Sequence, residues 1–529
     1  MTDRHPKTAG RPPAASPGAG GAPVPQLLQS AVAMHRTGRL DEALALYRKV
    51  LAVQPTHPDA VCLEGTVLLQ RGNLDAARAR LEEATRLGPE NPDAHNNYGN
   101  ALRKLGQTET AIAAFRKALD LRPRFAEAWN NLGSTLATIG EAAEAEAAFR
   151  EALATDPGYG PAAFNLSRLL QMHGRDDEAI ACLDALVANG AASPDIHNQL
   201  GVLHQRSGHV DAAEQSYRRA VQQEPRHAKA HNNLGTLLQA MNRREDALAS
   251  YRTAVALDPG YTAAQRNLGL LLQALGQWQA ATRVMEDLRA ADPDDPIARH
   301  VLAALRGETT PAAPRAYLQS MFDNFAPTFE QHLTEVLKYR APQQLRDSLD
   351  AHLAETAAGR RFARVLDMGC GTGLVARAVQ DIGEEIVGID LAPRMAAAAR
   401  ASGLYAAVHE CTLDDHFATT AAAPERFDLV LCADLFIYIG DVAGIVRAVA
   451  GRLTADGLFA FSVEHCEGAD YELRQTGRYA QSQPYLTRLA HDSGLRVVRV
   501  DPVVLREEKG RPVDGRVYVL SRHSPGSDG

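Results

Sequence analysis

Three alternating glycines preceded by an acid form the segment of this chain that is best suited to hold a ligand. Residues Val365 to Gly373 read V-L-D-M-G-C-G-T-G, so an apolar run ends on Asp367 and is followed by Gly369, Gly371 and Gly373. This pattern predicts a buried strand, a tight turn and a helix, and glycine lets the backbone approach a ligand where a Cβ would intrude. The same glycines could also serve only the turn itself.

A second acid follows the next apolar segment. Ile386 to Ile389 reads as a strand that ends on Asp390, where nucleotide-binding sheets place an acid against a ribose. The glycine spacing differs from the G-x-G-x-x-G of dinucleotide sites, and the lysine of a phosphate-binding loop is absent. An acid at the turn repels a pyrophosphate but suits a cofactor with a sulfonium and an amino group. The two acids therefore predict S-adenosylmethionine as the cofactor.

Composition excludes several classes of partner and site. The chain has 529 residues, enough for more than one domain, and its net charge of −8 predicts neither a nucleic-acid nor a membrane surface. Six scattered cysteines without a C-x-x-C pair predict no metal site and a reducing, cytoplasmic location. No apolar run approaches the ~18 residues that span a bilayer. Residues 1–23, rich in Pro, Ala and Gly, are expected to be a disordered leader, and residues 523–529 a disordered tail.

A 34-residue periodicity dominates the first part of the chain. Small residues recur at this interval, and they are Ala31, Gly65, Gly99, Gly133, Ser167, Gly201, Gly235 and Gly269. Sixteen residues after each small residue stands a large apolar one, namely Tyr47, Leu81, Phe115, Phe149, Leu183, Tyr217, Tyr251 and Met285. Prolines close most units. The spacing predicts eight helix pairs in which the small position allows close approach and the large side chain fills the space between the helices.

This pattern resembles the tetratricopeptide repeat over residues 24 to 295, with Ala191 in place of one closing proline. A helix at Ile297 to Leu305 is expected to cap the stack, which gives an array over residues 24–305. The resemblance implies an α-solenoid, a superhelix with a concave groove that binds a protein or peptide.

An amide side chain lies two residues before the small position in most units. These residues are Asn97, Asn131, Asn165, Asn233 and Asn267, with Gln199 at the same phase. An amide both donates and accepts hydrogen bonds, so the ladder could hold an extended polypeptide, as a similar ladder does in the array of the O-linked GlcNAc transferase. Alternatively, the amides bond to neighbouring helices and only stabilise the stack.

The pattern changes after a connector rich in Thr, Pro and Ala, which predicts a linker at residues 306–316 and a second domain at residues 317–522. Apolar segments alternate there with helical stretches, and they are residues 364–367, 385–390, 406–409, 427–432, 458–463, 496–500 and 516–520. This alternation predicts a doubly wound α/β sheet of seven strands, in which the last strand returns antiparallel.

The second domain resembles the class I S-adenosylmethionine-dependent methyltransferases, which have a Rossmann-like sheet. The whole chain is similar to bacterial proteins described as predicted methyltransferases fused to tetratricopeptide repeats. The further motifs that carry this resemblance are F-D-N-F-A at 322–326, Y-R-A-P at 339–342, D-L-F-I-Y-I-G-D at 434–441, T-G-R-Y-A at 476–480 and L-R-E at 505–507.

The resemblance implies a set of cofactor-binding residues. Asp367 would bind the methionine amino group, and Asp390 would accept bonds from both ribose hydroxyls. The backbone of Gly369, Cys370, Gly371 and Gly373 would approach the cofactor, with Cys370 as a small spacer. Further contacts are expected from Leu391 on the adenine face, from Thr412 and Leu413 after the third strand and from Ala433 after the fourth.

Methyl transfer is expected to be an in-line displacement that depends mainly on positioning. An oxygen or carbon acceptor also needs a base, and the candidates near strand ends are Asp434, Tyr438, Glu464 and His465. Candidates for binding the acceptor are Tyr339, Arg478 and Tyr479, although the last two could instead secure a helix that is expected to start near Gln481. Gln481 stands where relatives are expected to have a histidine, which weakens any proposal for a base on that helix.

Two questions stay open from the sequence. The aromatic segment with Tyr317, Phe322, Phe325, Phe329, His332 and Tyr339 predicts an amphipathic helix that either packs into the core or covers the site. The chain as a whole could be a methyltransferase whose array binds a protein, a small-molecule O- or C-methyltransferase whose array serves assembly, or a non-catalytic scaffold with a degenerate domain. The retained acids and glycines favour an enzyme. The N-P-P-Y tetrapeptide of adenine N-methylation is absent after the fourth strand, which disfavours an adenine acceptor.

Overall fold

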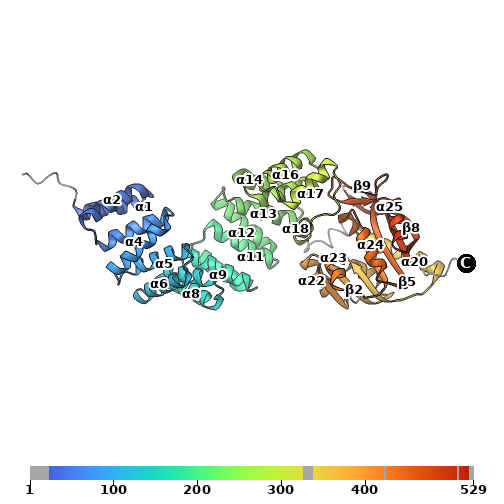
Figure 1. Cartoon of the computed structure of the whole chain (residues 1–529), viewed down its shortest axis with the longest axis horizontal. Helices are drawn as coiled ribbons and strands as arrows, with labels where there is room; N and C mark the ends of the chain where they lie inside the picture. The colour runs from blue at the N-terminus through green and yellow to red at the C-terminus, as the bar shows by residue number, and fades with distance from the viewer. Residues whose placement is uncertain (1–22, 326–337, 422–424, 509–510, 523–529) are drawn as a thin grey trace, which may run out of the picture. The chain divides into compact units, whose positions relative to one another are not determined.

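The computed structural model describes residues 23–325, 338–421, 425–508 and 511–522. The chain forms two compact units, Met1–Ala213 and Glu214–Gly529, and Figure 1 shows the elements of each. Nearly all of the predicted leader, the predicted tail, and Phe329 and His332 of the aromatic segment lie outside the described residues.

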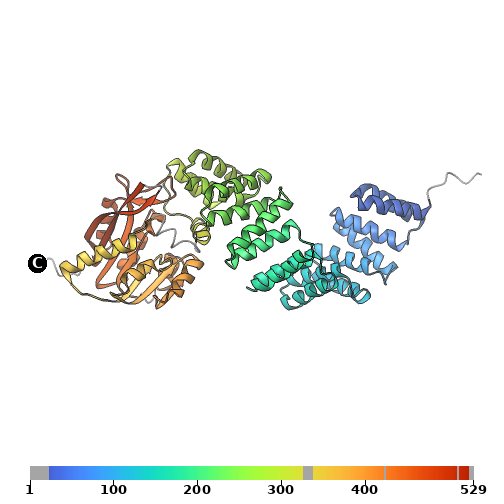
Figure 2. The same cartoon turned by 180° about the vertical axis from the view of Figure 1, so that it is seen from behind.

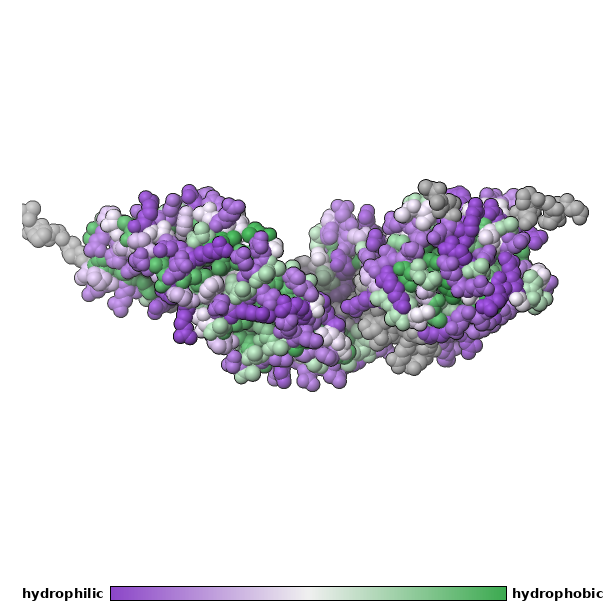
Figure 3. Space-filling model, turned by 90° about the horizontal axis from the view of Figure 1, so that it is seen from below, coloured by the Kyte–Doolittle hydropathy of each residue, from purple (hydrophilic) through white to green (hydrophobic). Residues whose placement is uncertain are grey.

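Helices α1 to α17 form the repeat region, and most successive helices pack as pairs (Figures 1 and 2). Their bounds are α1 Val24–Arg36, α2 Leu40–Val53, α3 Pro58–Gln70, α4 Leu74–Leu87, α5 Pro92–Lys104, α6 Thr108–Leu121, α7 Ala126–Thr138, α8 Ala142–Thr155, α9 Gly160–Met172, α10 Asp176–Ala188, α11 Pro194–Arg206, α12 Val210–Gln223, α13 Ala228–Ala240, α14 Arg244–Leu257, α15 Thr262–Ala274, α16 Trp278–Ala291 and α17 Pro296–Arg306. The predicted α-solenoid is therefore confirmed. From the side shown in Figure 3, hydrophilic residues cover most of the visible surface and hydrophobic areas are scattered among them.

The small positions of the repeats lie directly against the large apolar positions. A Cβ added to Gly99 would lie 2.6 Å from the Phe115 ring, and one added to Gly235 would lie 2.7 Å from the Tyr251 ring. Both aromatic side chains are fully or almost fully buried. The 16-residue spacing read from the sequence is therefore a contact between the two helices of one repeat.

This contact predicts how much stability is lost when one methyl group is added at a small position. Gly235→Ala is expected to destabilise Glu214–Gly529 by about 1–3 kcal/mol, because the added methyl group would overlap the buried Tyr251 ring and force it to shift. Calorimetric unfolding of the full chain measures the change. Gly260→Ala is the matched control, since its Cβ would approach no closer than 3.5 Å to Asp258. Equal unfolding temperatures for the two variants would contradict the packing argument.

A mostly parallel sheet forms the core of the C-terminal domain. Its strands are β1 Phe362–Met368, β2 Gly383–Asp390, β3 Ala407–Glu410, β4 Phe427–Cys432, β5 Leu453–His465, β6 Tyr471–Leu473, β7 Tyr479–Gln481, β8 Leu495–Glu508 and β9 Arg511–Arg522. The order β3-β2-β1-β4-β5 continues through β9 to β8, and β9 pairs antiparallel with both β5 and β8. All seven predicted strands are present, including the antiparallel last strand, and the predicted Rossmann-like fold is confirmed.

Helices cover both faces of this sheet because its strands alternate their side chains. In β4, Leu429 and Leu431 pack with helices α20 (Ala341–Thr356) and α21 (Leu374–Val379). Val430 and Cys432 face the opposite layer, formed by α23 (Leu413–Thr419), α24 (Ala443–Ala450) and α25 (Gln483–Asp492). Both faces are therefore buried, as is typical of parallel strands.

The short strands β6 and β7 were not predicted. They form an antiparallel hairpin, and β7 also pairs with the end of β5 through Glu464 and His465. The position of Gln481 therefore differs from the prediction, because this residue lies in β7 and α25 begins only after the N-cap Ser482. The buried Gln481 side chain donates to the backbone oxygens of Phe436 at 3.0 Å and Ile439 at 2.7 Å. Strands of three residues carry too little alternation to be recognised in a sequence.

The tip of this hairpin docks on the last repeat within Glu214–Gly529. Gln273 of α15 donates to the backbone oxygen of Gln475 at 2.9 Å, and the buried His300 of α17 lies 3.4 Å from that of Gly477. Gly477 has a φ of +81°, and a Cβ there would lie 2.5 Å from the Tyr317 hydroxyl. The repeats and the sheet therefore share an interface in this unit.

The predicted linker is also tied to the sheet domain. Pro311 accepts backbone hydrogen bonds from Gly440 at 2.8 Å and Asp441 at 2.9 Å. Of the aromatic segment, helix α18 (Arg315–Phe325) contains Tyr317, which is buried against the His300 ring, and Phe322, which lies edge-on to Tyr438. The part that is described therefore packs into the interface between the repeats and the sheet.

Candidate active site

A cavity of about 1180 Å³ lies at the carboxyl ends of strands β1, β2 and β4. Its sheet-side wall comes from Gly369 to Thr372, from Asp390 and Leu391, from Cys411 to Asp414 and from Ala433 to Leu435. Ligands of open α/β sheets bind at this edge. The segments that the sequence singled out after four strands are thus brought to one cavity.

The glycine turn adopts a conformation that side chains oppose. Gly369, Gly371 and Gly373 have φ values of +72°, +53° and +96°. Residues with a Cβ rarely adopt such values, so these positions favour glycine for the backbone alone. Between them, Cys370 is buried and lines the cavity, and burial raises the pKa of its thiol.

Asp390 joins the turn to the end of β2. One carboxylate oxygen accepts from the backbone N–H of Gly371 at 2.8 Å, and the other accepts from Ala392 at 2.8 Å. A carboxylate has about four acceptor positions, so further hydrogen bonds can form on the cavity side. Burial raises the pKa of this group.

Asp367 lies behind the turn and does not line the cavity among the residues described. It is fully buried, and the Tyr405 hydroxyl donates to one of its oxygens at 2.7 Å. The other oxygen has no hydrogen-bond partner in the described parts of the chain. Burial raises the pKa of Asp367 to about 7. The contact of Asp367 with a methionine amino group, which the resemblance implies, therefore stays a prediction.

The segment after β3 contributes both predicted and unpredicted residues. Thr412 lines the cavity, but its hydroxyl oxygen also caps helix α23 by accepting from the Asp415 N–H at 3.0 Å. Leu413 lines the cavity beside it. Asp414, which sequence reasoning missed, places an exposed carboxylate at the same wall. It stands two residues after Thr412, which sequence reasoning did assign to this segment.

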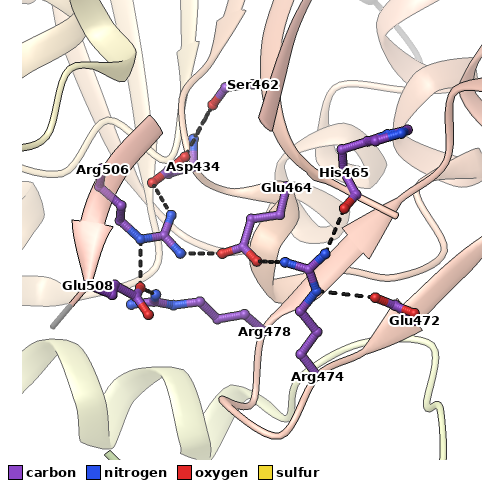
Figure 4. A network of polar contacts seen from close by, with 9 residues as sticks. All are labelled: Asp434, Ser462, Glu464, His465, Glu472, Arg474, Arg478, Arg506 and Glu508. Atoms are coloured by element: carbon purple, nitrogen blue, oxygen red, sulfur yellow. Dashed lines mark hydrogen bonds and ion pairs between the residues drawn. The ribbon is translucent and has the colours of Figure 1, made fainter. Parts of the chain in front are cut away.

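A network of charges surrounds Asp434, the second residue after β4 (Figure 4). Asp434 has a φ of +52°, and its N–H and carboxylate both bond to the Ser462 hydroxyl, at 2.9 Å and 3.3 Å. The guanidinium of Arg506, which is 2% exposed, donates to Asp434 at 3.2 Å, to Glu508 at 2.8 Å and to Glu464. Burial raises the pKa of Asp434, and Arg506 opposes that rise.

Arg506 is the main residue of this network that sequence reasoning did not assign. The sequence showed it only as part of the L-R-E motif, which says nothing of its partners. It lies 72 residues after Asp434 and 42 after Glu464, so only the folded sheet reveals the contact.

The four candidate bases do not share one location. Asp434 and Tyr438 line the cavity. Glu464 does not; it is buried between Arg506 and Arg474, and Arg474 donates to it at 2.8 Å. His465 lies at a separate recess with Cys466 and Arg516, whose guanidinium is 3.3 Å from the imidazole. In Figure 4 the imidazole of His465 points away from the network, which it joins only through its backbone oxygen.

The three candidate acceptor-binding residues also lie in different places. Tyr339 and Arg478 line the cavity, and Arg478 forms an ion pair with Glu508. Tyr479 is fully buried, and its hydroxyl lies 2.5 Å from that of Thr310. Burial raises the pKa values of Tyr339 and Tyr438, so both hydroxyls stay protonated at neutral pH.

The amide ladder makes contacts between neighbouring repeats. Each amide N–H group described here donates to the preceding repeat, and the bonds run from Asn97 to Thr66, from Asn131 to Asn96, from Asn165 to Asn130 and Ser134, from Gln199 to Gln171 and from Asn267 to Asn232. Asn233 also has a partner. The amides thus stabilise the stack, and only Asn267 of the ladder also lines the cavity.

The described parts of the chain hold no group of three or more His, Cys, Asp or Glu side chains arranged to bind a metal ion. Among the same residues, no helix is both long and apolar enough to cross a bilayer.

Comparison with known proteins agrees with this architecture. A family model described as "Methyltransferase domain" matches residues 337–500, and tetratricopeptide repeat models match residues 27–49, 62–123, 99–160, 140–201, 198–238 and 241–305. The solved structure of the tetratricopeptide repeat protein YrrB shares 21% identity at a TM-score of 0.30, covering 36% of this chain and 97% of YrrB.

Among the curated relatives are two O-methyltransferases. The malonyl-[acyl-carrier protein] O-methyltransferase of Enterobacter lignolyticus is 32% identical over 193 residues, which cover 36% of this chain and 71% of the relative. The ubiquinone biosynthesis O-methyltransferase of Bordetella pertussis is 29% identical over 185 residues, which cover 32% of this chain and 76% of that protein. The chain therefore belongs to the methyltransferase family and joins a methyltransferase domain to an array of tetratricopeptide repeats.

Proposed function

We propose that this protein transfers a methyl group from S-adenosylmethionine to an acceptor bound in the cavity, and that its repeats bind a protein partner or substrate. The observation that carries the proposal is the convergence of the positive-φ glycine turn and Asp390 on one cavity at the carboxyl edge of the sheet. When bound, the cofactor supplies an electrophilic methyl group on a sulfonium.

The groups at the sheet-side wall fit such a cofactor. Asp390 retains acceptor positions for ribose hydroxyls, and Leu391 offers an apolar contact for the adenine, with Thr412 and Leu413 at its edge. The backbone of Gly369, Cys370 and Gly371 faces the methionine part, and Gly373 ends the turn. The buried carboxylate of Asp367, with one oxygen unpartnered in the described chain, supplies negative charge behind the turn that favours an ammonium group.

We assign the acceptor to the part of the cavity next to Ala433 and Asp434. The raised pKa of Asp434 brings this carboxylate closer to the range in which it can accept a proton from an acceptor hydroxyl. Tyr438, Tyr339 and Arg478 line the same cavity, and we assign to them the hydrogen bonds to the acceptor. Glu464 holds Arg506 in place, and we assign no role to His465 because its imidazole lies at the other recess.

Titration calorimetry with S-adenosylmethionine tests the proposal. Wild-type protein is expected to bind, and Asp390→Ala is expected to bind at least about 100-fold more weakly, because two hydrogen bonds to a charged group are lost. Asp347→Ala, which removes an exposed acid of α20, is the matched control and is expected to bind like wild type.

Asp390→Asn guards against misfolding of the alanine variant, since an amide keeps one acceptor for the turn. Circular dichroism checks that each variant folds. Absence of binding by folded wild-type protein would leave only the scaffold interpretation, and equal binding by wild type and Asp390→Ala would remove the assigned cofactor site.

A further inference from the structure

The cavity extends from the cofactor side to the last two repeats. Seven residues of these repeats line it, and the polar and aromatic ones are Gln239 of α13, Arg244 of α14, Asn267 and Gln273 of α15 and Trp278 of α16. All belong to the unit Glu214–Gly529, which also contains the sheet. The repeats therefore form part of the wall against which an acceptor would lie.

The amides on this wall are suited to an extended backbone. The side chain of Gln273 already binds a backbone segment of this chain, since it donates to the backbone oxygen of Gln475 at 2.9 Å. The side-chain amide of Asn267 donates one hydrogen bond to the side-chain oxygen of Asn232 at 3.0 Å. No described residue donates to the side-chain oxygen of Asn267. That oxygen is available to accept from a peptide N–H.

Three arginines from three elements line the same cavity. Arg244 of α14, Arg315 of α18 and Arg511 of β9 line it, and none of the three guanidinium groups forms a hydrogen bond or ion pair with a described residue. Of the acids that line the cavity, Asp434 and Glu508 bond to Arg506, Asp390 accepts from the glycine turn and Asp441 accepts from Tyr485, whereas the exposed Asp414 lies at the sheet-side wall. Among the described residues, the wall that the repeats, α18 and β9 supply therefore carries three arginines and no acid.

We infer that the acceptor is an acidic polypeptide segment that lies extended against the last two repeats. Asn267 and Gln239 hold its backbone, and Arg244, Arg315 and Arg511 bind its carboxylates. Repeat and sheet domain thus build the acceptor site together. This inference rests on the proposed function and names the class of substrate for that same site.

Fluorescence of Trp278 in the full chain tests the inference. Trp278 lines the cavity and Trp129 of α7 is the only other tryptophan of the chain, so Trp129→Phe leaves one reporter. The probe is a blocked decapeptide of alternating Glu and Ala, and its control has Gln at every Glu position. We expect the Glu peptide to change the fluorescence and to bind at least about tenfold more tightly than the Gln peptide.

Charge variants locate the binding. Arg244→Ala with Arg511→Ala is expected to weaken the Glu peptide at least about tenfold, because each arginine contributes a charge-assisted bond. Arg283→Ala, which removes an exposed arginine of α16 that does not line the cavity, is expected to leave the affinity unchanged.

Four results would overturn the inference. They are no binding of the Glu peptide, equal binding of Glu and Gln peptides, equal weakening by Arg283→Ala, and binding of N-acetylglutamate amide as tight as that of the decapeptide. The last result would assign the site to a small acid. Calorimetry with S-adenosylmethionine on the same variants is a separate readout, so failure of the acidic acceptor is distinguishable from failure of the proposed cofactor site.

Discussion

Arg506→Met is expected to lower the free energy of unfolding of Glu214–Gly529 by about 3–5 kcal/mol. The guanidinium is 2% exposed and bonds to Asp434, Glu464 and Glu508, so its removal leaves buried carboxylates without their shared partner. A methionine fills much of the same volume, and the loss is therefore electrostatic. Calorimetric unfolding of the full chain measures it.

Two further variants test whether the lost stability comes from this charge network or from the loss of any arginine. Combining Arg506→Met with Glu464→Gln is expected to recover part of the loss, because the most buried of the three carboxylates that lose Arg506 is then neutral. Arg361→Met, which removes an exposed arginine 3.8 Å from Glu384, is expected to cost at most about 1 kcal/mol. A loss for Arg506→Met no greater than that of Arg361→Met would contradict the network as described.

Asp367→Asn is expected to make the cofactor-free protein more stable at pH 8, by up to about 4 kcal/mol. Burial raises the folded-state pKa of Asp367 from 3.8 to about 7. The group therefore costs nothing below pH 4, and wild-type stability falls as pH rises from about 4 to 7. Above pH 7 the full cost is present. An amide has no such cost, and Tyr405 can still donate to it.

Thermal unfolding of both proteins between pH 5 and pH 8 measures this dependence. The advantage of the Asn variant is expected to shrink by about 1.4 kcal/mol per pH unit below pH 7. If the difference in stability were the same at every pH, the buried charge would not be its cause. In calorimetry, Asp367→Asn is expected to bind S-adenosylmethionine more weakly, because the charge that favours an ammonium group is lost.

The residues behind these predictions differ in how far they could be identified from the sequence. The glycine turn, Asp367 and Asp390 were visible in the sequence because a strand, a turn and a helix are local, and their residues lie within about 25 positions. The cavity that unites the glycine turn and Asp390 with Thr412, Leu413 and Ala433 follows from the parallel sheet, which brings the carboxyl ends of its strands to one edge.

The charge network shows the limit of such reasoning. Asp434, Glu464 and His465 all stand near strand ends, yet one lines the cavity, one is buried between arginines and one lies at another recess. A strand places successive side chains on opposite faces, so Glu464 and His465 diverge although they are neighbours. Which partner each meets depends on strands far away in the chain.

By itself, the sequence determined the local elements of this protein: eight repeat units from a 34-residue period and seven alternating strands from apolar runs bounded by turns. Only the tertiary structure decided that Arg506 lies beside Asp434 and that the last two repeats share a cavity with the glycine turn. Helical repeats, strands and turns depend on residues that are close together in the sequence. Charge pairs and cavity walls arise between residues that are far apart in the chain, so they exist only once the repeats and the sheet have packed together.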